Sequence, residues 1–474
     1  MADRRGQTRL RPGCLTEREL SRISSPCPPL LASRSTDEYD ALAPGDLQRR
    51  AAASLDGWNP AALATRRGTA ATLRALDAEA GGGFFEVPFG AELDDEVAAA
   101  VFSGSSPVID VQTHLVRPSR ITTAGATALL GFLRMVEPDR WSEPVDHRLL
   151  SAPAWASTVF AGSETALALL TSPPGLPGEG VIDNPDIAAA RELVDRYAGT
   201  SRLLTHAIVH PNLAHGALNH AELDRMADWS SALRPAGWKV YTLWDPPGAG
   251  HGPGGPGWFL DDDIGEAFLD RVEALGPRIV CTHKGLAGLI TGDTPATASP
   301  RDVGPAAAAH PGVEFVVYHS GYDLDPDGEE GPHDDDSDRG VSRLVTSLTK
   351  AGIAPGANVW AELGSTWFLM LRRPREAAHI IAKLLAAVGP ERILWGTDSV
   401  WYGPPQPLID AFRAFRIPEW MQERYGYPAL TPDAIDGILG RNAVELYGVE
   451  PTPRDADEIE WISSCRAELA VRLA

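Results

Sequence analysis

From residue 107 onward, the chain alternates short apolar stretches with amphipathic stretches. The apolar stretches, which we expect to be strands, are Val108–His114, Ala166–Leu170, Leu203–Val209, Trp238–Leu243, Arg278–Thr282, Glu314–Tyr318, Asn358–Glu362 and Arg392–Gly396. Helical spacing marks the segments Asp186–Tyr197, Ala221–Leu233, Asp263–Leu275, Val341–Lys350 and Pro374–Val388 between them. Such alternation is typical of parallel βα units. Eight of them predict an α/β fold, a closed (β/α)8 TIM barrel.

An open, doubly wound sheet is the alternative architecture for the same alternation. That fold would carry a glycine-rich nucleotide fingerprint after its first strand. No GxGxxG pattern is present, and the glycines between residues 248 and 257 are interleaved with proline, which indicates a flexible loop. The barrel therefore remains the favoured fold.

Two additions flank the expected barrel of residues 106–450. Residues 1–105 are predicted to be an N-terminal arm, rich in Ser, Pro and Arg, followed by a helical extension over residues 46–80 and 94–102. Residues 451–474 are predicted to form a C-terminal helix. An arm of this length suits packing on the body or on a partner subunit, so a homodimer is an open expectation.

The charge and cysteine content exclude several classes of partner. A net charge of −22 argues against nucleic acid and against an anionic membrane surface, both of which need a basic face. Nine acidic residues lie between Asp323 and Asp338, a run that we interpret as a solvated surface loop. The four cysteines form no CxxC pair, and neither an export signal nor a segment of about 20 apolar residues is found. These features predict a cytoplasmic protein that does not enter a membrane.

Polar side chains of metal-binding type stand at the carboxyl ends of five expected strands, where the chemistry of a parallel barrel is found. They are Gln112, His114, His283, His319, Glu362 and Asp398. Taken singly, a strand-end His is usually a hydrogen-bonded core residue, and a strand-end Asp usually caps the next helix. Gathered at one mouth, they would repel one another or lack partners unless a cation were bound. The sequence therefore predicts a metal site.

The order of these residues resembles that of the amidohydrolase superfamily, in the branch that contains hydrolases and aminocarboxymuconate-type decarboxylases. The matching motifs are Asp110-x-Gln-x-His114, His283, His319 and Thr397-Asp398, and the resemblance extends over residues 107–448. It implies that His114, His283, His319 and Asp398 are metal ligands or water-activating groups. Asp398 would be the general base, and His319 would stabilise the developing oxyanion. Lys239 is near the position where some members carry a bridging lysine carbamate or glutamate, and it is a third candidate catalytic residue.

The sequence departs from the family pattern at Gln112, which replaces the first His of a His-x-His pair. Together with the extra carboxylate of Glu362, the carboxamide suits two divalent ions, with iron favoured and zinc or manganese as alternatives. In this respect the chain resembles TIM-barrel non-heme diiron monooxygenases of platensimycin and platencin biosynthesis. That resemblance favours hydroxylation of a bulky, terpenoid-like hydrophobic acid or its acyl thioester, such as a CoA thioester. Hydrolysis or decarboxylation by a metal-activated water is the alternative, and a third is a barrel that has lost its metal and only binds a ligand.

Aromatic residues follow the fourth, seventh and eighth expected strands. They are Trp244, Trp258, Trp367, Trp401 and Tyr402. We expect them to form the walls of a pocket for a small hydrophobic substrate. The alternative is that they pack the top of the barrel against its additions.

Overall fold

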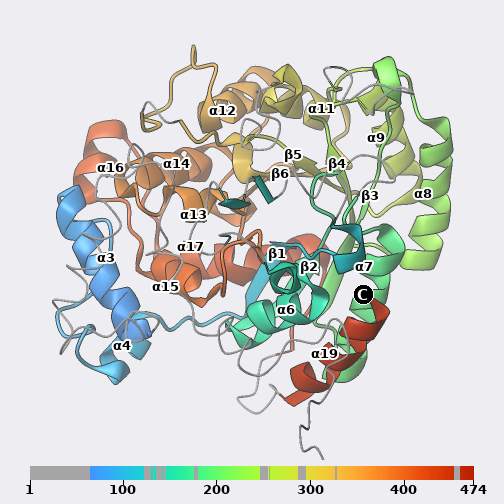
Figure 1. The fold of residues 1–474 in the computed structure, drawn as a ribbon. Coiled ribbons are helices and arrows are strands. Elements are labelled where there is room, and N and C mark those ends of the chain that lie inside the picture. The colour runs from blue at the N-terminus through green and yellow to red at the C-terminus, as the bar shows by residue number, and fades with distance from the viewer. Residues whose placement is uncertain are drawn as a thin grey trace, which may run out of the picture.

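The computed structural model describes residues 65–121, 130–131, 133–134, 141, 146–175, 180–245, 255, 257–286, 295–325, 328–452 and 460–473. Eight parallel strands form one sheet whose spatial order is the order of the chain (Figure 1). The strands are β1 Val108–Thr113, β2 Thr165–Leu170, β3 Leu203–Ile208, β4 Gly237–Tyr241, β5 Ile279–His283, β6 Glu314–Tyr318, β7 Val359–Glu362 and β8 Ile393–Leu394. Each lies within a few residues of its predicted position, so the predicted barrel is confirmed.

The barrel is closed by contacts between β1 and the segment that follows β8. The backbone N–H of Val111 donates to the carbonyl of Trp395 at 3.0 Å, and that of Asp398 donates to the carbonyl of Gln112 at 2.9 Å. The buried carboxylate of Asp110 accepts hydrogen bonds from the backbone N–H and the hydroxyl of Thr397, at 3.0 and 2.5 Å. The Asp110 and Thr397-Asp398 motifs are thus neighbours in space, and together they seal the barrel.

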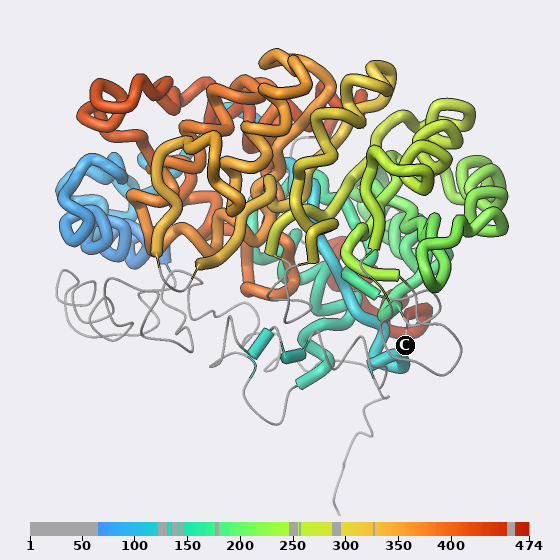
Figure 2. Tube along the Cα trace, turned by 90° about the horizontal axis from the view of Figure 1, so that it is seen from above, coloured from blue at the N-terminus to red at the C-terminus, as the bar shows by residue number. Residues whose placement is uncertain are grey.

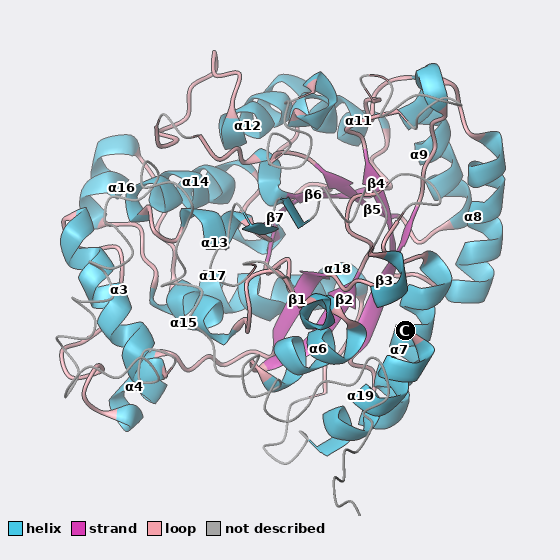
Figure 3. Ribbon diagram, viewed as in Figure 1, coloured by secondary structure: helices cyan, strands magenta, loops and turns pink. Residues whose placement is uncertain are grey.

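Helices surround the barrel, as Figure 3 shows by colour. The α-helices described are α3 Arg66–Ala80, α4 Asp95–Val101, α6 Ala152–Ala156, α7 Asn184–Ala198, α8 His220–Leu233, α9 Asp263–Leu275, α11 Val303–Ala309, α12 Gly340–Ala351, α13 Thr366–Met370, α14 Pro374–Ala387, α15 Gln406–Ala414, α16 Glu419–Tyr425, α17 Pro432–Asp436, α18 Asn442–Tyr447 and α19 Glu460–Arg472. The five helices expected within the barrel all form, as α7, α8, α9, α12 and α14.

Helix α9 shows how local sequence sets these boundaries. The carboxylate of Asp262 accepts hydrogen bonds from the backbone N–H groups of Ile264 and Gly265, which caps the first turn. Ile264, Phe268, Leu269 and Val272 recur on one face and are buried. Capping and one apolar stripe therefore place this helix against the sheet.

The strands are buried on both faces, as expected when helices cover the outside of a parallel barrel. Ile279 and Cys281 of β5 lie on the strand face that also carries His283, because side chains alternate along a strand. They belong to a buried cluster that includes Trp360 of β7 and Ala443 of α18. Apolar packing thus fills the barrel on one side of the strand-end polar groups and supports them.

The chain additions pack on opposite sides of the barrel. Figures 1 and 2, taken from perpendicular directions, both show α3 and α4 beside the helices α14 to α16 and show α19 beside α7. Contacts of α3 with α14 and α15, and of α19 with α6 and α7, agree with these views. The arm predicted for residues 1–45 lies outside the described residues, as does the part before residue 65 of the helix predicted for residues 46–80, whose remainder forms as α3. Within the described part of the chain, no helix has both the length and the apolar character that a membrane crossing requires.

The acidic segment of residues 323–338 is more than a solvated loop. The carboxylate of Glu330 accepts the backbone N–H groups of Val341 and Ser342 at 3.0 Å each, and so caps α12 from outside that helix. The same carboxylate forms an ion pair with the buried Lys383 of α14. Residues 334–336 are exposed as predicted. The prediction is therefore right for the tip of the segment and wrong for Glu330, which anchors it.

Candidate metal centre at the barrel mouth

The backbone is unusual where the strands reach the mouth. His319, Ser365 and Asp398, which follow β6, β7 and β8, have φ angles of +65°, +55° and +61°. This left-handed region is rare for residues that carry a Cβ, and such residues gather at sites where the fold holds a side chain in a required position. The turns after β6, β7 and β8 therefore direct side chains into the mouth at a cost in backbone energy.

His114 and Asp398 form one close pair at this mouth. The Nδ1–H of His114 donates to the carbonyl of Thr171 at 2.7 Å, and its Nε2 lies 2.9 Å from Oδ1 of Asp398. The ring of Trp401 stacks on the imidazole, with 5.7 Å between ring centroids. The rotation of His114 is therefore fixed by a carbonyl on one side and an indole on its face.

His283 and His319 form the second close pair. The Nδ1–H of His319 donates to the carbonyl of Gly364 at 2.6 Å, and its Nε2 lies 3.1 Å from Nδ1 of His283. Nε2 of His283 is buried and has no hydrogen-bond partner among the residues that the structure describes. Burial lowers the pKa of His319 to about 4 and that of His283 well below its ordinary value. Both imidazoles are therefore neutral at pH 7, which is the form that binds metal ions.

The two pairs act on each other electrostatically. The charge of Asp398 opposes the lowering of the His319 pKa, and His114 contributes to the lowering of the His283 pKa after burial and His319. All four side chains are at most 6% exposed. Four of the six predicted ligands thus share one buried electrostatic environment at the strand ends.

The carboxylate of Asp398 is surrounded by donors. Its Oδ1 accepts the indole N–H of Trp401 at 3.0 Å and the amide N–H of Gln112 at 3.1 Å, and its Oδ2 accepts the hydroxyl of Ser365. Burial alone would raise the pKa of Asp398, but hydrogen bonds from His114 and Ser365 and nearby positive charge lower it to about 2. Asp398 is therefore an anion at neutral pH.

Gln112 and Glu362, the other two predicted ligands, are also at the mouth, but their hydrogen bonds differ from those of the first four. The amide nitrogen of Gln112 faces Asp398, while its Oε1 is buried without a hydrogen-bond partner. Glu362 accepts the backbone N–H of His319 at 3.1 Å and of Gly364 at 2.5 Å, one on each carboxylate oxygen. Burial raises the pKa of Glu362 to about 8. In this geometry Gln112 positions Asp398, and Glu362 holds the turns after β6 and β7.

Lys239 of β4 is buried within the barrel, paired in register with Cys281 of β5, whereas Tyr241 is the residue paired with His283. Its side-chain nitrogen has no hydrogen-bond partner in the described part of the chain, and it lies 3.5 Å from the ring centroid of Tyr318 and 4.7 Å from that of Tyr241. Burial lowers the pKa of Lys239 to about 7. Lys239 is thus an amine poised between its charged and neutral forms.

A separate polar network lies beside Lys239, within the barrel. Nδ1 and Nε2 of His206 lie 3.2 Å from the hydroxyls of Tyr318 and Tyr447, respectively, and Sγ of Cys281 lies 3.6 Å from Nε2. Burial raises the pKa of Cys281 to about 12, so the thiol stays protonated. The network satisfies buried polar groups where α18 packs against the strands, and we assign it no chemistry.

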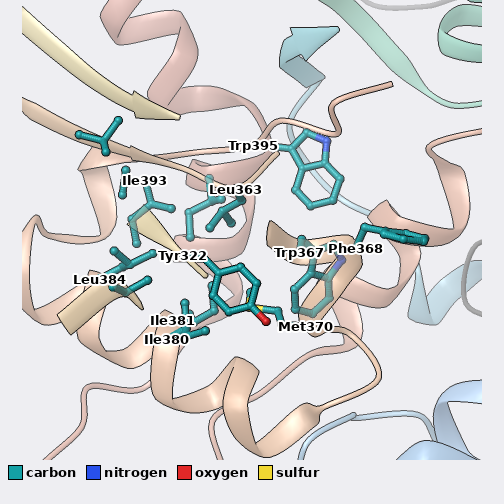
Figure 4. Packing of buried hydrophobic residues seen from close by; sticks show 14 of the residues in the cluster. Tyr322, Leu363, Trp367, Phe368, Met370, Ile380, Ile381, Leu384, Ile393 and Trp395 are labelled. Carbon is teal, nitrogen blue, oxygen red and sulfur yellow. The ribbon is translucent and has the colours of Figure 1, made fainter. Parts of the chain in front are cut away.

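The predicted aromatic walls divide into three groups. Trp258 is fully buried against Phe268 of α9, and Trp367 lies inside the apolar cluster shown in Figure 4, beside Met370. These two side chains pack the core and do not form walls of the mouth. Trp401 and Tyr402 support the site, since Trp401 binds Asp398 and Tyr402 binds Ser365. Trp244 is partly exposed and stacks on Tyr241, so it alone of the five keeps a position suited to a wall.

The types of side chain at the mouth suit a divalent cation, although among the described residues no three of them bring ligand atoms within 4.8 Å of one another. His114 and His319 each give their Nδ1–H to a backbone carbonyl, and this leaves Nε2 to face the centre, as is usual for metal-binding histidines. His283 adds an imidazole nitrogen with no partner, and Asp398 adds an anionic oxygen. Nitrogen and oxygen donors of this kind suit zinc, iron or manganese.

A second group of metal-binding side chains lies on the outside of the barrel. Ligand atoms of Asp270, Glu273 and His310 lie within 4.8 Å of one another, and His310 also contacts Glu266 at 3.2 Å. His310 is already paired with two carboxylates, and Asp270 is exposed. Ion pairing accounts for this cluster, and it serves below as a control.

Comparison with known proteins identifies the family. Residues 109–449 match the family described as "Amidohydrolase". The chain belongs to the amidohydrolase family. This places it among the metal-dependent enzymes of the amidohydrolase superfamily, as the sequence resemblance predicts. A search of the curated proteins finds no match.

Several solved structures resemble this amidohydrolase at low sequence identity. A probable 2-pyrone-4,6-dicarboxylic acid hydrolase from Acinetobacter baumannii is 13% identical, with 72% of this chain and 99% of that chain covered and a TM-score of 0.42. A 2,6-dihydroxybenzoate decarboxylase from Rhizobium is 14% identical, with 73% and 99% covered and a TM-score of 0.42. A 5-carboxyvanillate decarboxylase from Novosphingobium aromaticivorans, complexed with manganese, is 12% identical, with 73% and 97% covered and a TM-score of 0.42. At this level of likeness, none of the three indicates what this amidohydrolase acts on.

Proposed function

We propose that this protein is a hydrolase that depends on one divalent metal ion and cleaves an amide, ester or lactone bond. The observation that carries the proposal is the pair of buried histidines, His114 and His319, whose Nδ1–H groups are held by backbone carbonyls. This arrangement presents Nε2 of His114 to the anionic carboxylate of Asp398 and Nε2 of His319 to His283. A divalent cation bound there would polarise a carbonyl oxygen and acidify a water molecule.

The side chains at the mouth have separate roles in this proposed hydrolysis. His114, His283 and His319 would hold the cation through their imidazole nitrogens. Asp398 stays anionic, accepts the proton of the attacking water at its carboxylate and returns it to the leaving group. Burial of these side chains excludes bulk water, which strengthens each electrostatic interaction in the site.

Decarboxylation of an organic acid is a second candidate, and the position of Lys239 favours it. Loss of CO2 leaves a carbon atom that must take up a proton. The amine of Lys239 has no hydrogen-bond partner among the described residues, and a pKa of about 7 lets it carry a proton near neutral pH. Lys239 is therefore suited to deliver that proton.

The diiron monooxygenase predicted from the sequence receives no support from the family or from the described geometry. That prediction needs Glu362 as a second metal-binding carboxylate. Both oxygens of Glu362 accept backbone N–H groups, which accounts for its position without a second ion. The aromatic evidence for a large hydrophobic substrate is also reduced, because Trp258 and Trp367 are packed in the core.

Metal analysis of the full-length protein tests the proposal directly. We expect about one equivalent of a divalent transition metal, lost in His283→Ala and retained in His310→Gln, which removes only the outer cluster. Turnover on a panel of amides, esters, lactones and aromatic acids should be unchanged in an anaerobic chamber. Two equivalents of iron with oxygen-dependent turnover would contradict the proposal of a hydrolase and support that of a monooxygenase. Release of CO2 from an acid without hydrolysis of any acyl bond would select the decarboxylase.

A further inference from the structure

Ser365 follows β7 and was not marked by any sequence motif, yet its hydroxyl contacts the carboxylate of the centre. Ser365 is 1% exposed, and its Oγ binds Oδ2 of Asp398 and lies 2.6 Å from the hydroxyl of Tyr402. A carboxylate can only accept, so the single hydroxyl hydrogen of Ser365 is given to Asp398. The hydroxyl of Tyr402 must then donate to Ser365. The result is a directed chain of donors, Tyr402 to Ser365 to Asp398.

This series of hydrogen bonds restrains Oδ2 of Asp398, whereas the other contacts described above are made to Oδ1. Gln112 and Trp401 both donate to Oδ1, the oxygen that lies 2.9 Å from Nε2 of His114. Donors on one oxygen alone leave the carboxylate free to rotate about its bond to Cβ. A donor on Oδ2 stops that rotation and keeps Oδ1 directed at His114.

The backbone of Ser365 shows that the fold maintains this contact at a cost. Its φ of +55° and ψ of −39° lie outside the regions that residues with a Cβ usually adopt. Glycine would adopt this conformation more readily. The first donor of the series, Tyr402, is also held in place, because its ring stacks on Phe368 with 3.9 Å between ring centroids. Strain and stacking thus converge on the placement of one hydroxyl group.

We propose that Ser365 is a positioning residue of the metal centre, whose hydroxyl, supported by Tyr402, orients the carboxylate of Asp398 for metal binding. The inference rests on the proposed metal-dependent function. It assigns Ser365 and Tyr402 no contact with substrate. It also explains why Tyr402, which the sequence suggests as a pocket wall, is 2% exposed and hydrogen-bonded beneath the centre.

Titration of the metal-free, full-length protein with Co2+ tests the proposal, with affinity measured by calorimetry and geometry by the visible absorption of the bound ion. Loss of a group that orients a metal ligand typically weakens affinity about 10- to 100-fold. We expect a loss in this range for Ser365→Ala, with an altered Co2+ spectrum. Tyr402→Phe, which keeps the ring stacked on Phe368, should show a smaller loss. Tyr427→Phe is the matched control, because it removes a hydroxyl that binds His379 at 2.7 Å away from the mouth, and its affinity should equal that of the wild type.

Ser365→Gly separates positioning from structural support. Glycine relieves the unfavourable backbone conformation, so the melting temperature should stay level or rise while Co2+ affinity still falls. Equal Co2+ affinity and an unchanged spectrum in Ser365→Ala and the wild type would overturn the inference and leave the proposed function intact. Absence of Co2+ binding by the wild-type protein would overturn both.

Discussion

Replacing Lys239 with methionine should stabilise the protein, and by an amount that depends on pH. The amine is fully buried and has no hydrogen-bond partner within the described ranges, whereas methionine has a similar length and needs none. Burial lowers the pKa of Lys239 from 10.5 to about 7, so the folded chain binds much more weakly a proton that the unfolded chain holds at neutral pH. At about 1.4 kcal/mol per pKa unit, this costs folding roughly 4 kcal/mol at pH 7.

The sign of the pH dependence follows from proton binding. Between pH 7 and 10.5 the unfolded chain binds more of a proton at Lys239 than the folded chain does, so the wild-type protein gains stability as pH rises. The cost carried by Lys239 falls from roughly 4 kcal/mol at pH 7 to about 1 kcal/mol at pH 9.5. The advantage of Lys239→Met over the wild type should shrink by the same amount. Urea unfolding of both proteins at pH 7 and 9.5 measures the difference.

Lys284 provides the matched control, because it is the same residue type, equally buried, but fully paired. Its amine donates to Oδ2 of Asp302 at 2.7 Å and to the carbonyl of Thr297 at 2.8 Å. Lys284→Met leaves the buried carboxylate without its partner and should destabilise the protein by about 3–5 kcal/mol. Destabilisation by Lys239→Met at both pH values, or a stabilisation that does not change with pH, would refute the reasoning.

Two further substitutions test packing in the core and at the mouth. Phe268→Ala leaves a cavity at a fully buried position on α9, so it should lower the free energy of unfolding in urea by about 3–5 kcal/mol. Phe89→Ala changes a residue that is 80% exposed and should lower it by at most about 0.5 kcal/mol. Gly396→Ala would place a Cβ 1.8 Å from Oε1 of Glu362, so it should displace Glu362 and reduce the metal content of the purified protein. Gly331→Ala is the control, because a Cβ there meets no described atom within 4 Å, and it should leave the metal content unchanged. A normal metal content in Gly396→Ala would contradict the close packing at the mouth.

The fold was predictable because its signal is local and repeated. Each strand is a short apolar run, and each helix has its own caps and its own buried face, as α9 shows. The strand-end histidines were predictable for a related reason. The carboxyl ends of all strands in a parallel barrel meet at one mouth, so the order of residues along the chain is enough to bring His114, His283 and His319 together.

The aromatic residues were harder to place, because a position just after a strand does not reveal on which side of the barrel wall a ring lies. Trp367 follows β7 closely, yet the short helix α13 directs it outward onto Phe412 of α15, with 5.0 Å between ring centroids. Trp401 follows β8 at a similar distance and turns inward to Asp398. The helices packed outside the strands decide between these outcomes, and they lie far away in the sequence.

By itself, the sequence determined the eightfold βα repeat and the imidazole and carboxylate groups that stand at the carboxyl ends of its strands. Only the tertiary structure decided which atoms of those groups face one another. The amide of Gln112 donates to Asp398, Glu362 is held by backbone N–H groups, and Ser365 supplies the donor to Oδ2. The physical reason is that a hydrogen bond depends on the donor–acceptor distance within a few tenths of an ångström and on the angle at the donor. Those orientations are set by turns and side chains that the sequence separates by tens or hundreds of residues.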